Sequence, residues 1–141
     1  MTAKQSNLDW VKCYYDAFNR RDWEWVGAML TPDVEWIYAA RDERVKGVSA
    51  VLASFRSLLE AAPTAFLDLK QAHDAGGVVI AECGIRHASS SLSNARGAAR
   101  TVTPASFCEV MELRNGRCAK GTSYADSVRL MMDISVPSVA A

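Results

Sequence analysis

The sequence lacks an excess of charge of either sign. Its 141 residues include 16 Lys and Arg and 16 Asp and Glu, so the formal net charge is zero. Proteins that bind nucleic acids usually carry a basic surplus or patch, and we therefore expect no nucleic-acid partner. A neutral surface also gives little electrostatic repulsion between copies of the chain, which favours self-association.

Signals for metal binding, cofactor binding and membrane insertion are also missing. The four cysteines form no CxxC pair and only two histidines are present, so the clustered ligands of a zinc site are lacking. No glycine-rich phosphate loop or nucleophile elbow is present. We therefore expect no metal and no cofactor. Residues 1–7 are polar and no long apolar run follows, which predicts neither a secretory signal nor a membrane span. We expect a cytoplasmic protein with reduced thiols.

Helical spacing of apolar residues dominates the first 62 residues. Between the second and third helical segments, 34–39 is rich in aromatic and β-branched residues and predicts a strand. The polar stretch 40–47 is interpreted as a loop. Ser6 or Asn7 is suited to cap the first helix, and Asp22 is suited to cap the second. The three predicted helices span 8–21, 23–30 and 48–62.

The second half of the chain has the pattern of strands joined by hairpins. Gly76-Gly77 and Asn115-Gly116 are typical of tight hairpin turns. Residues 88–100 are small and polar and predict a mobile loop or a long hairpin tip. The predicted strands span 65–73, 78–87, 101–114 and 117–126.

These segments predict one α+β domain over residues 1–134, followed by a loose tail over 135–141. Half of the residues are apolar, which suffices for a real core at this length. We expect the helices to pack on one face of a curved, mostly antiparallel sheet. The concave surface between the two layers is a natural place for a pocket.

Five short motifs follow one another over residues 10–130. They are Tyr14-Tyr15-Asp16-Ala17-Phe18-Asn19 followed by Asp22, Pro32-Asp33-Val34-Glu35-Trp36, Gly47-Val48, Asn115-Gly116-Arg117 and Tyr124-Ala125-Asp126. In this order they resemble the SnoaL-like branch of the NTF2-like superfamily, which includes polyketide cyclases, ketosteroid isomerases, scytalone dehydratase and limonene-epoxide hydrolases. The resemblance implies a conical domain around a deep apolar cavity, a small apolar molecule as ligand, and a homodimer formed through the sheet.

Asp126 is the first catalytic candidate. It ends the last predicted strand, on the face of Tyr124 if residues alternate. The resemblance matches it to an aspartate that acts as a general acid or base. An apolar cavity raises the pKa of a carboxyl group toward the working pH. The alternative is that Asp126 only caps a helical turn at 127–133.

Glu109 and Tyr14 are the other catalytic candidates. Glu109 shares a strand face with Phe107 and Met111, where a carboxylate is either buried at a cost or placed for use. The resemblance matches Glu109 and Tyr14 to the two groups that form the oxyanion hole of ketosteroid isomerases. The alternative for Glu109 is a structural glutamate paired with an arginine in a dimer interface. The alternative for Tyr14 is an ordinary core tyrosine.

Six residues are candidates for binding substrate. Alternation places His73 on the face of Leu67 and Leu69, where it can be a base with a pKa near neutrality, although its place before Gly76 also suits a solvated residue. The aromatic and methionine side chains among the six can equally be ordinary core. The candidates are Trp36, Tyr38, Phe55, His73, Met111 and Tyr124.

These candidates predict a cofactor-independent enzyme that moves a proton next to the carbonyl group of a small apolar compound, in a cyclisation, isomerisation or dehydration. A non-catalytic ligand-binding or dimerisation module remains an alternative, as does an epoxide hydrolase in which Asp126 and Tyr38 hold a water molecule. Tyr38 stands where the isomerases carry their basic aspartate, and the Arg-x-Asp pair of limonene-epoxide hydrolases is absent. Both departures count against those two specific chemistries.

Overall fold

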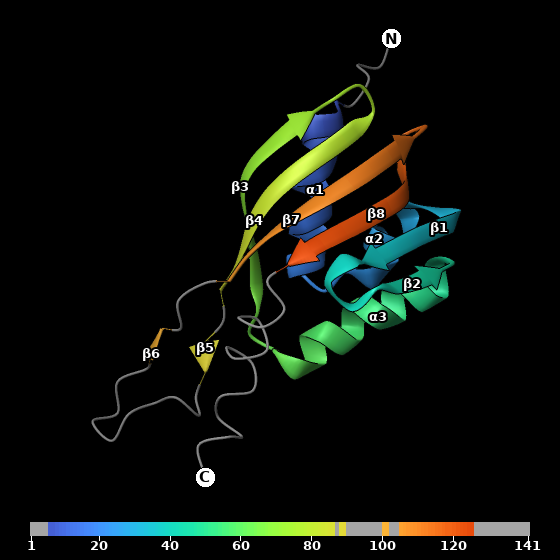
Figure 1. The fold of residues 1–141 in the computed structure, drawn as a ribbon. Helices are drawn as coiled ribbons and strands as arrows, with labels where there is room; N and C mark the ends of the chain where they lie inside the picture. Colours follow the sequence, from blue (N-terminus) through green and yellow to red (C-terminus); the bar gives the residue numbers. More distant parts are fainter. Residues whose placement is uncertain (1–5, 87, 90–99, 102–104, 126–141) are drawn as a thin grey trace.

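The computed structural model describes residues 6–86, 88–89, 100–101 and 105–125. Helices cover one face of a twisted six-stranded sheet, which we call the inner face (Figure 1). The helices are α1 (Asn7–Asn19), α2 (Trp23–Ala28) and α3 (Val48–Ala61), with a short 3-10 turn, η1 (Ala39–Arg41). The strands of the sheet are β1 (Leu30–Tyr38), β2 (Glu43–Lys46), β3 (Phe66–Asp74), β4 (Val78–Arg86), β7 (Ala105–Arg114) and β8 (Arg117–Ala125).

The sheet has the strand order β2-β1-β8-β7-β4-β3. Neighbouring strands run antiparallel except for β1 and β8, which are parallel. Helix α1 lies behind β3 and β4, whereas α3 lies against β1 and β2 (Figure 1). This arrangement confirms the predicted α+β architecture of helices packed on a mostly antiparallel sheet.

The local signals for helix starts and hairpin turns are confirmed. The Ser6 hydroxyl accepts a hydrogen bond from the backbone N–H of Asp9 at 3.0 Å and caps α1. A carboxylate oxygen of Asp22 caps α2 by accepting from the N–H of Trp25 at 3.2 Å. Asn115 and Gly116 both have positive φ, 52° and 77°, as the tight turn of a two-residue hairpin requires.

Two predictions in the first half of the chain are wrong. The second helix ends at Ala28 and β1 already begins at Leu30, four residues before the predicted strand. The pairing of β1 with β8 is irregular between Leu30 and Glu35, where the missing N–H of Pro32 is tolerated. The polar stretch 40–47 contains η1 and β2 rather than a loop alone. Strand β2 escaped prediction because a charged edge strand needs no buried, alternating face.

Several predictions fall on segments that the structure leaves undescribed. These are the helical turn at 127–133, the tail at 135–141 and therefore the domain boundary at 134. Within the stretch 88–100 and just beyond it, the structure describes one short antiparallel pair, β5 (Ala88–Ser89) with β6 (Arg100–Thr101).

Candidate functional site

A buried carboxyl group, Glu109, lies on the inner face of the sheet. Its side chain is only 8% exposed. The hydroxyl of Tyr15 donates to Oε1 of Glu109 at 2.5 Å, and the hydroxyl of Ser123 donates to Oε2 at 2.5 Å. The indole Nε1–H of Trp36 in turn donates to Oγ of Ser123 at 2.9 Å. These four residues form one connected set of hydrogen bonds, which we call the Glu109 network.

Strand register brings the network together. Glu109 on β7 lies directly opposite Ser123 on β8, and Ser123 lies beside Tyr38 on β1. Cross-strand neighbours share a face of the sheet, so these three side chains lie on the inner face. Tyr15 reaches the same face from α1, which packs over β3 and β4.

Trp36 reaches Ser123 because the neighbouring residue on β8 has no side chain. Gly121 lies opposite Trp36 in the parallel pairing of β1 with β8. A Cβ atom on Gly121 would lie 2.2–2.5 Å from three carbons of the indole ring. The indole therefore lies flat over the glycine and presents its N–H to the hydroxyl two residues further along β8.

Burial raises the pKa of Glu109 above its ordinary value, whereas the hydrogen bonds from Ser123 and Tyr15 lower it in part. A basic side chain is not among the groups that act on this pKa in the described part of the chain. The carboxyl group therefore keeps its proton to a higher pH than an exposed glutamate does, which is the direction that a general acid or a neutral hydrogen-bond donor needs.

The raised pKa of Glu109 predicts a pH-dependent stability. Between the ordinary pKa of 4.5 and the folded-state pKa, the folded protein keeps a proton that the unfolded chain has released. The resulting stability is complete below the unfolded value and is lost as the pH rises through the folded-state pKa. Each unit of pKa difference contributes about 1.4 kcal/mol.

Glu109→Gln removes this titration. We therefore expect the free energy of unfolding of the wild type, relative to that of Glu109→Gln, to fall as the pH rises from 4.5 through the folded-state pKa of Glu109. Urea unfolding at several pH values measures it. Glu112→Gln is the matched control, because Glu112 lies on the same strand and is exposed. Parallel pH curves for the wild type and Glu109→Gln would contradict the expectation.

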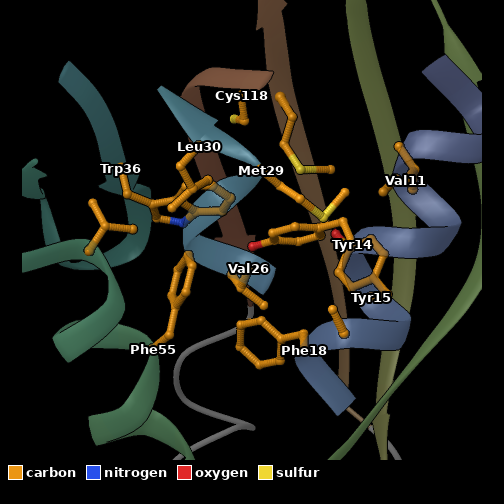
Figure 2. Close-up of a cluster of buried hydrophobic side chains, with 14 of the residues drawn as sticks. Val11, Tyr14, Tyr15, Phe18, Val26, Met29, Leu30, Trp36, Phe55 and Cys118 are labelled. Carbon is orange, nitrogen blue, oxygen red and sulfur yellow. The ribbon is translucent and has the colours of Figure 1, made fainter. Parts of the chain in front are cut away.

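Tyr15, which is not among the predicted site residues, is the tyrosine that bonds Glu109. The predicted candidate, Tyr14, lies next to it on α1 and points into the apolar core. The Tyr14 ring stacks on Trp10 with ring centres 5.2 Å apart and lies 6.3 Å from Trp36. Figure 2 shows Tyr14 extending from α1 into the middle of the apolar cluster. Burial raises the pKa of both phenols well above the ordinary value.

Four of the six substrate-binding candidates are gathered on the inner side of the sheet. Trp36, Phe55 and Met111 are buried in the same core as Tyr14, and the rings of Trp36 and Phe55 meet edge to face at 4.9 Å. Tyr38 is buried beside them. Its hydroxyl lies 2.7 Å from Oγ of Ser54 and burial raises its pKa to about 12.

The other two candidates lie on the opposite face of the sheet. A β-bulge between Leu69 and Gln71 reverses the alternation of β3, so the expectation that His73 shares the face of Leu69 is wrong. His73 instead contacts Glu82 at 3.0 Å on the outer face. Tyr124 neighbours the inward Ser123 on β8, points outward and is 52% exposed.

Asp126, the first catalytic candidate, lies outside the described residues. Its role remains a prediction from the sequence. Ser123 was not predicted as a site residue. Its only signal in the sequence is that it follows Gly121 by two residues on a predicted strand, so both residues lie on one face of that strand.

Among the described residues, no group of His, Cys, Asp or Glu side chains is arranged to hold a metal ion. No helix in the described segments is long and apolar enough to cross a bilayer.

A pocket of about 530 Å³ lies elsewhere, between the start of α1, α2 and the turn that joins β7 to β8. None of the candidate residues is among those that line it, and the Glu109 network is therefore a separate feature. The lining residues are Trp10, Asp22, Glu24, Trp25, Ala28, Met29, Asn115, Gly116 and Arg117.

Comparisons with known proteins identify the domain family and the fold of the chain. Residues 11–121 match the sequence profile of the SnoaL-like domain. A search of curated proteins gives no match. A candidate SnoaL-like polyketide cyclase from Shewanella putrefaciens is similar in structure, with 13% identity, a TM-score of 0.73 and coverage of 96% of this chain and 98% of that one.

Two further solved structures are similar. An NTF2-like protein of unknown function from Burkholderia pseudomallei has 22% identity, a TM-score of 0.74 and coverage of 94% of this chain and 99% of its own. A candidate ketosteroid isomerase from Kribbella flavida has 17% identity, a TM-score of 0.65 and coverage of 82% and 74%. At these identities the likeness establishes the NTF2-like fold, which hosts many different functions.

Proposed function

Because the chain belongs to the SnoaL-like domain family, we propose that it is a cofactor-independent enzyme that moves a proton next to the carbonyl group of a small apolar compound. The reaction would be a cyclisation, an isomerisation or a dehydration. Structural relatives that include a candidate polyketide cyclase and a candidate ketosteroid isomerase support this class of reaction. The small apolar ligand and the homodimer expected from the resemblance belong to the same proposal.

The observation that carries the proposal is the buried carboxyl group of Glu109. An isolated charge at this depth is costly unless it is hydrogen-bonded or neutralised. The network supplies two hydroxyl donors, from Tyr15 and Ser123, but no compensating cation. Such a group is a candidate for function, because a purely structural core position is usually filled more cheaply by an apolar residue.

In the proposed mechanism, one group removes a proton from the carbon beside the carbonyl, and a second stabilises the negative charge that develops on the oxygen. The sequence assigns the first role to Asp126. Glu109 in its neutral form, together with the phenol of Tyr15, fills the second role. Hydrogen bonds to a developing charge are strongest in an apolar site whose donors are already in place. Tyr15 therefore takes the role that the sequence assigned to Tyr14.

Hydrogen–deuterium exchange tests this proposal without knowledge of the natural substrate. A cyclic ketone, a 1,3-diketone and an α,β-unsaturated ketone are each incubated with the protein in D2O, and loss of the proton signals beside the carbonyl is followed by NMR. We expect exchange of at least one class to exceed the rate in buffer. Binding of these compounds without any faster exchange between pH 5 and pH 9 would favour the non-catalytic ligand-binding module instead.

A further inference from the structure

The hydrogen bonds between Trp36, Ser123 and Glu109 have a fixed direction. An indole N–H can only donate, so the hydroxyl oxygen of Ser123 must accept from Trp36. A serine hydroxyl has one proton, and the oxygen that lies 2.5 Å away on its other side is Oε2 of Glu109. The serine oxygen could accept a second bond, but among the described residues Oε2 is the acceptor available to the Ser123 proton, and a Ser123 that accepted from Oε2 would leave its own proton without a partner. Ser123 is therefore the donor to Oε2 whether the carboxyl group is ionised or neutral.

The second carboxyl oxygen, Oε1, has a partner that can change direction. Tyr15 lies 2.5 Å from Oε1, and a phenol hydroxyl can both donate and accept. When Glu109 is ionised, Tyr15 donates to Oε1. When Glu109 is neutral, a proton on Oε2 would face the proton of Ser123, whereas a proton on Oε1 can be donated to the oxygen of Tyr15.

We propose that Trp36 and Ser123 are positioning residues that confine the acidic proton of Glu109 to Oε1, the oxygen that faces Tyr15. This assignment rests on the proposed function, which needs the proton of a neutral Glu109 to be held in one direction. It goes beyond that function because it gives a role to two residues that carry no titratable group.

The other titratable groups around Glu109 stay neutral over the working range of pH. They come from the elements packed around it: Tyr14 on α1, Tyr38 on β1, Cys83 on β4 and Cys118 on β8. Burial raises the pKa of Tyr38, Cys83 and Cys118 to about 12 in each case, and that of Tyr14 is also raised. The direction of the hydrogen bonds, rather than a neighbouring charge, therefore decides which oxygen holds the proton.

Infrared spectroscopy of the neutral carboxyl group tests the assignment. The C=O stretch of Glu109 is identified by its loss in Glu109→Gln. If the proton is on Oε1, the C=O oxygen is Oε2, which accepts from Ser123. Ser123→Ala should then move the band to higher frequency, because the C=O loses its donor. It should also raise the pKa of Glu109 by about one unit, because the lost bond is stronger to the ionised carboxyl group than to the neutral one.

Two further variants separate positioning from a general loss of structure. Ser123→Thr keeps the hydroxyl and should restore the wild-type band and pKa. Trp36→Phe keeps an aromatic ring but removes the N–H that turns the Ser123 proton away from the indole and toward Oε2. The hydroxyl can then take other orientations, and the band should split or broaden. An unchanged band and pKa in Ser123→Ala would overturn the proposal. An unchanged band in folded Trp36→Phe would overturn the role proposed for Trp36. The Trp36→Phe measurement also tests the proposal if Ser123→Ala does not fold.

These spectra need no substrate, so the two proposals fail separately. A wild type that shows the expected bands but no proton exchange would reject the proposed function and keep the proton assignment. Rapid proton exchange, together with bands that do not change in Ser123→Ala, would keep the proposed function and reject the proton assignment.

Discussion

Glu109→Gln is expected to slow proton exchange beside a carbonyl group by about 100- to 1,000-fold, the usual cost of weakening one hydrogen-bond donor to a developing oxyanion. The amide has nearly the shape of the carboxyl group and can still bond Tyr15 and Ser123. It is, however, a weaker hydrogen-bond donor than a neutral carboxyl group, so it stabilises the developing charge less. The loss should therefore appear in the rate of the bound compound, with little change in the affinity for an apolar ketone.

The measurement is the exchange rate at saturating ketone, with the affinity taken from a titration followed by ligand signals. Glu112→Gln serves as the control, because it makes the same chemical change at an exposed position on the same strand. It should exchange at the wild-type rate. Equal rates for Glu109→Gln and the wild type would remove Glu109 from the mechanism and leave Asp126 as the remaining carboxyl candidate.

Gly121→Ala is expected to lower the free energy of unfolding by about 3–5 kcal/mol, the range found when a large aromatic side chain loses its place in a core. The new methyl group would overlap the indole of Trp36, with separations as short as 2.2 Å. The backbone of β8 cannot retreat easily because it is paired with β1 on one side and β7 on the other. The indole is enclosed in turn by Phe55 and Tyr14.

Gly27→Ala is the matched control for this substitution. Its added Cβ would lie 3.2 Å from the end of the flexible Leu52 side chain, and alanine favours a helix more than glycine does. We expect a change within about 1 kcal/mol there. Combining Gly121→Ala with Trp36→Phe should cost less than the sum of the two single changes, because both act on the same contact. Strict additivity in urea unfolding would show that the overlap is relieved elsewhere.

Local sequence signals predicted most of the fold because each depends on a few adjacent residues. Ser6, Asp22 and the pair Asn115-Gly116 act through their own backbone neighbourhood, and the structure confirms all of them. Strand β2 depends instead on its pairing with β1 at the sheet edge, and its charged sequence carries no sign of that partner.

The site was less predictable because it depends on register and on the rotation of a helix. Tyr14 and Tyr15 are adjacent on α1 and both are buried, so helical spacing alone cannot say which one meets Glu109. A regular hairpin would place Thr122 opposite Glu109. A bulge between Glu112 and Leu113 shifts the pairing of β7 with β8 by one residue, so Ser123 lies opposite Glu109 instead. Such bulges leave no clear mark in the sequence.

The sheet order has a consequence for synthesis of the protein. Strand β1 emerges early from the ribosome, yet one of its two neighbours, β8, is made long afterwards. Until then Trp36 has neither Gly121 beneath it nor Ser123 beside it. The side of Trp36 that faces β8 is therefore covered only late in translation, and a holding chaperone could bind the exposed indole until then.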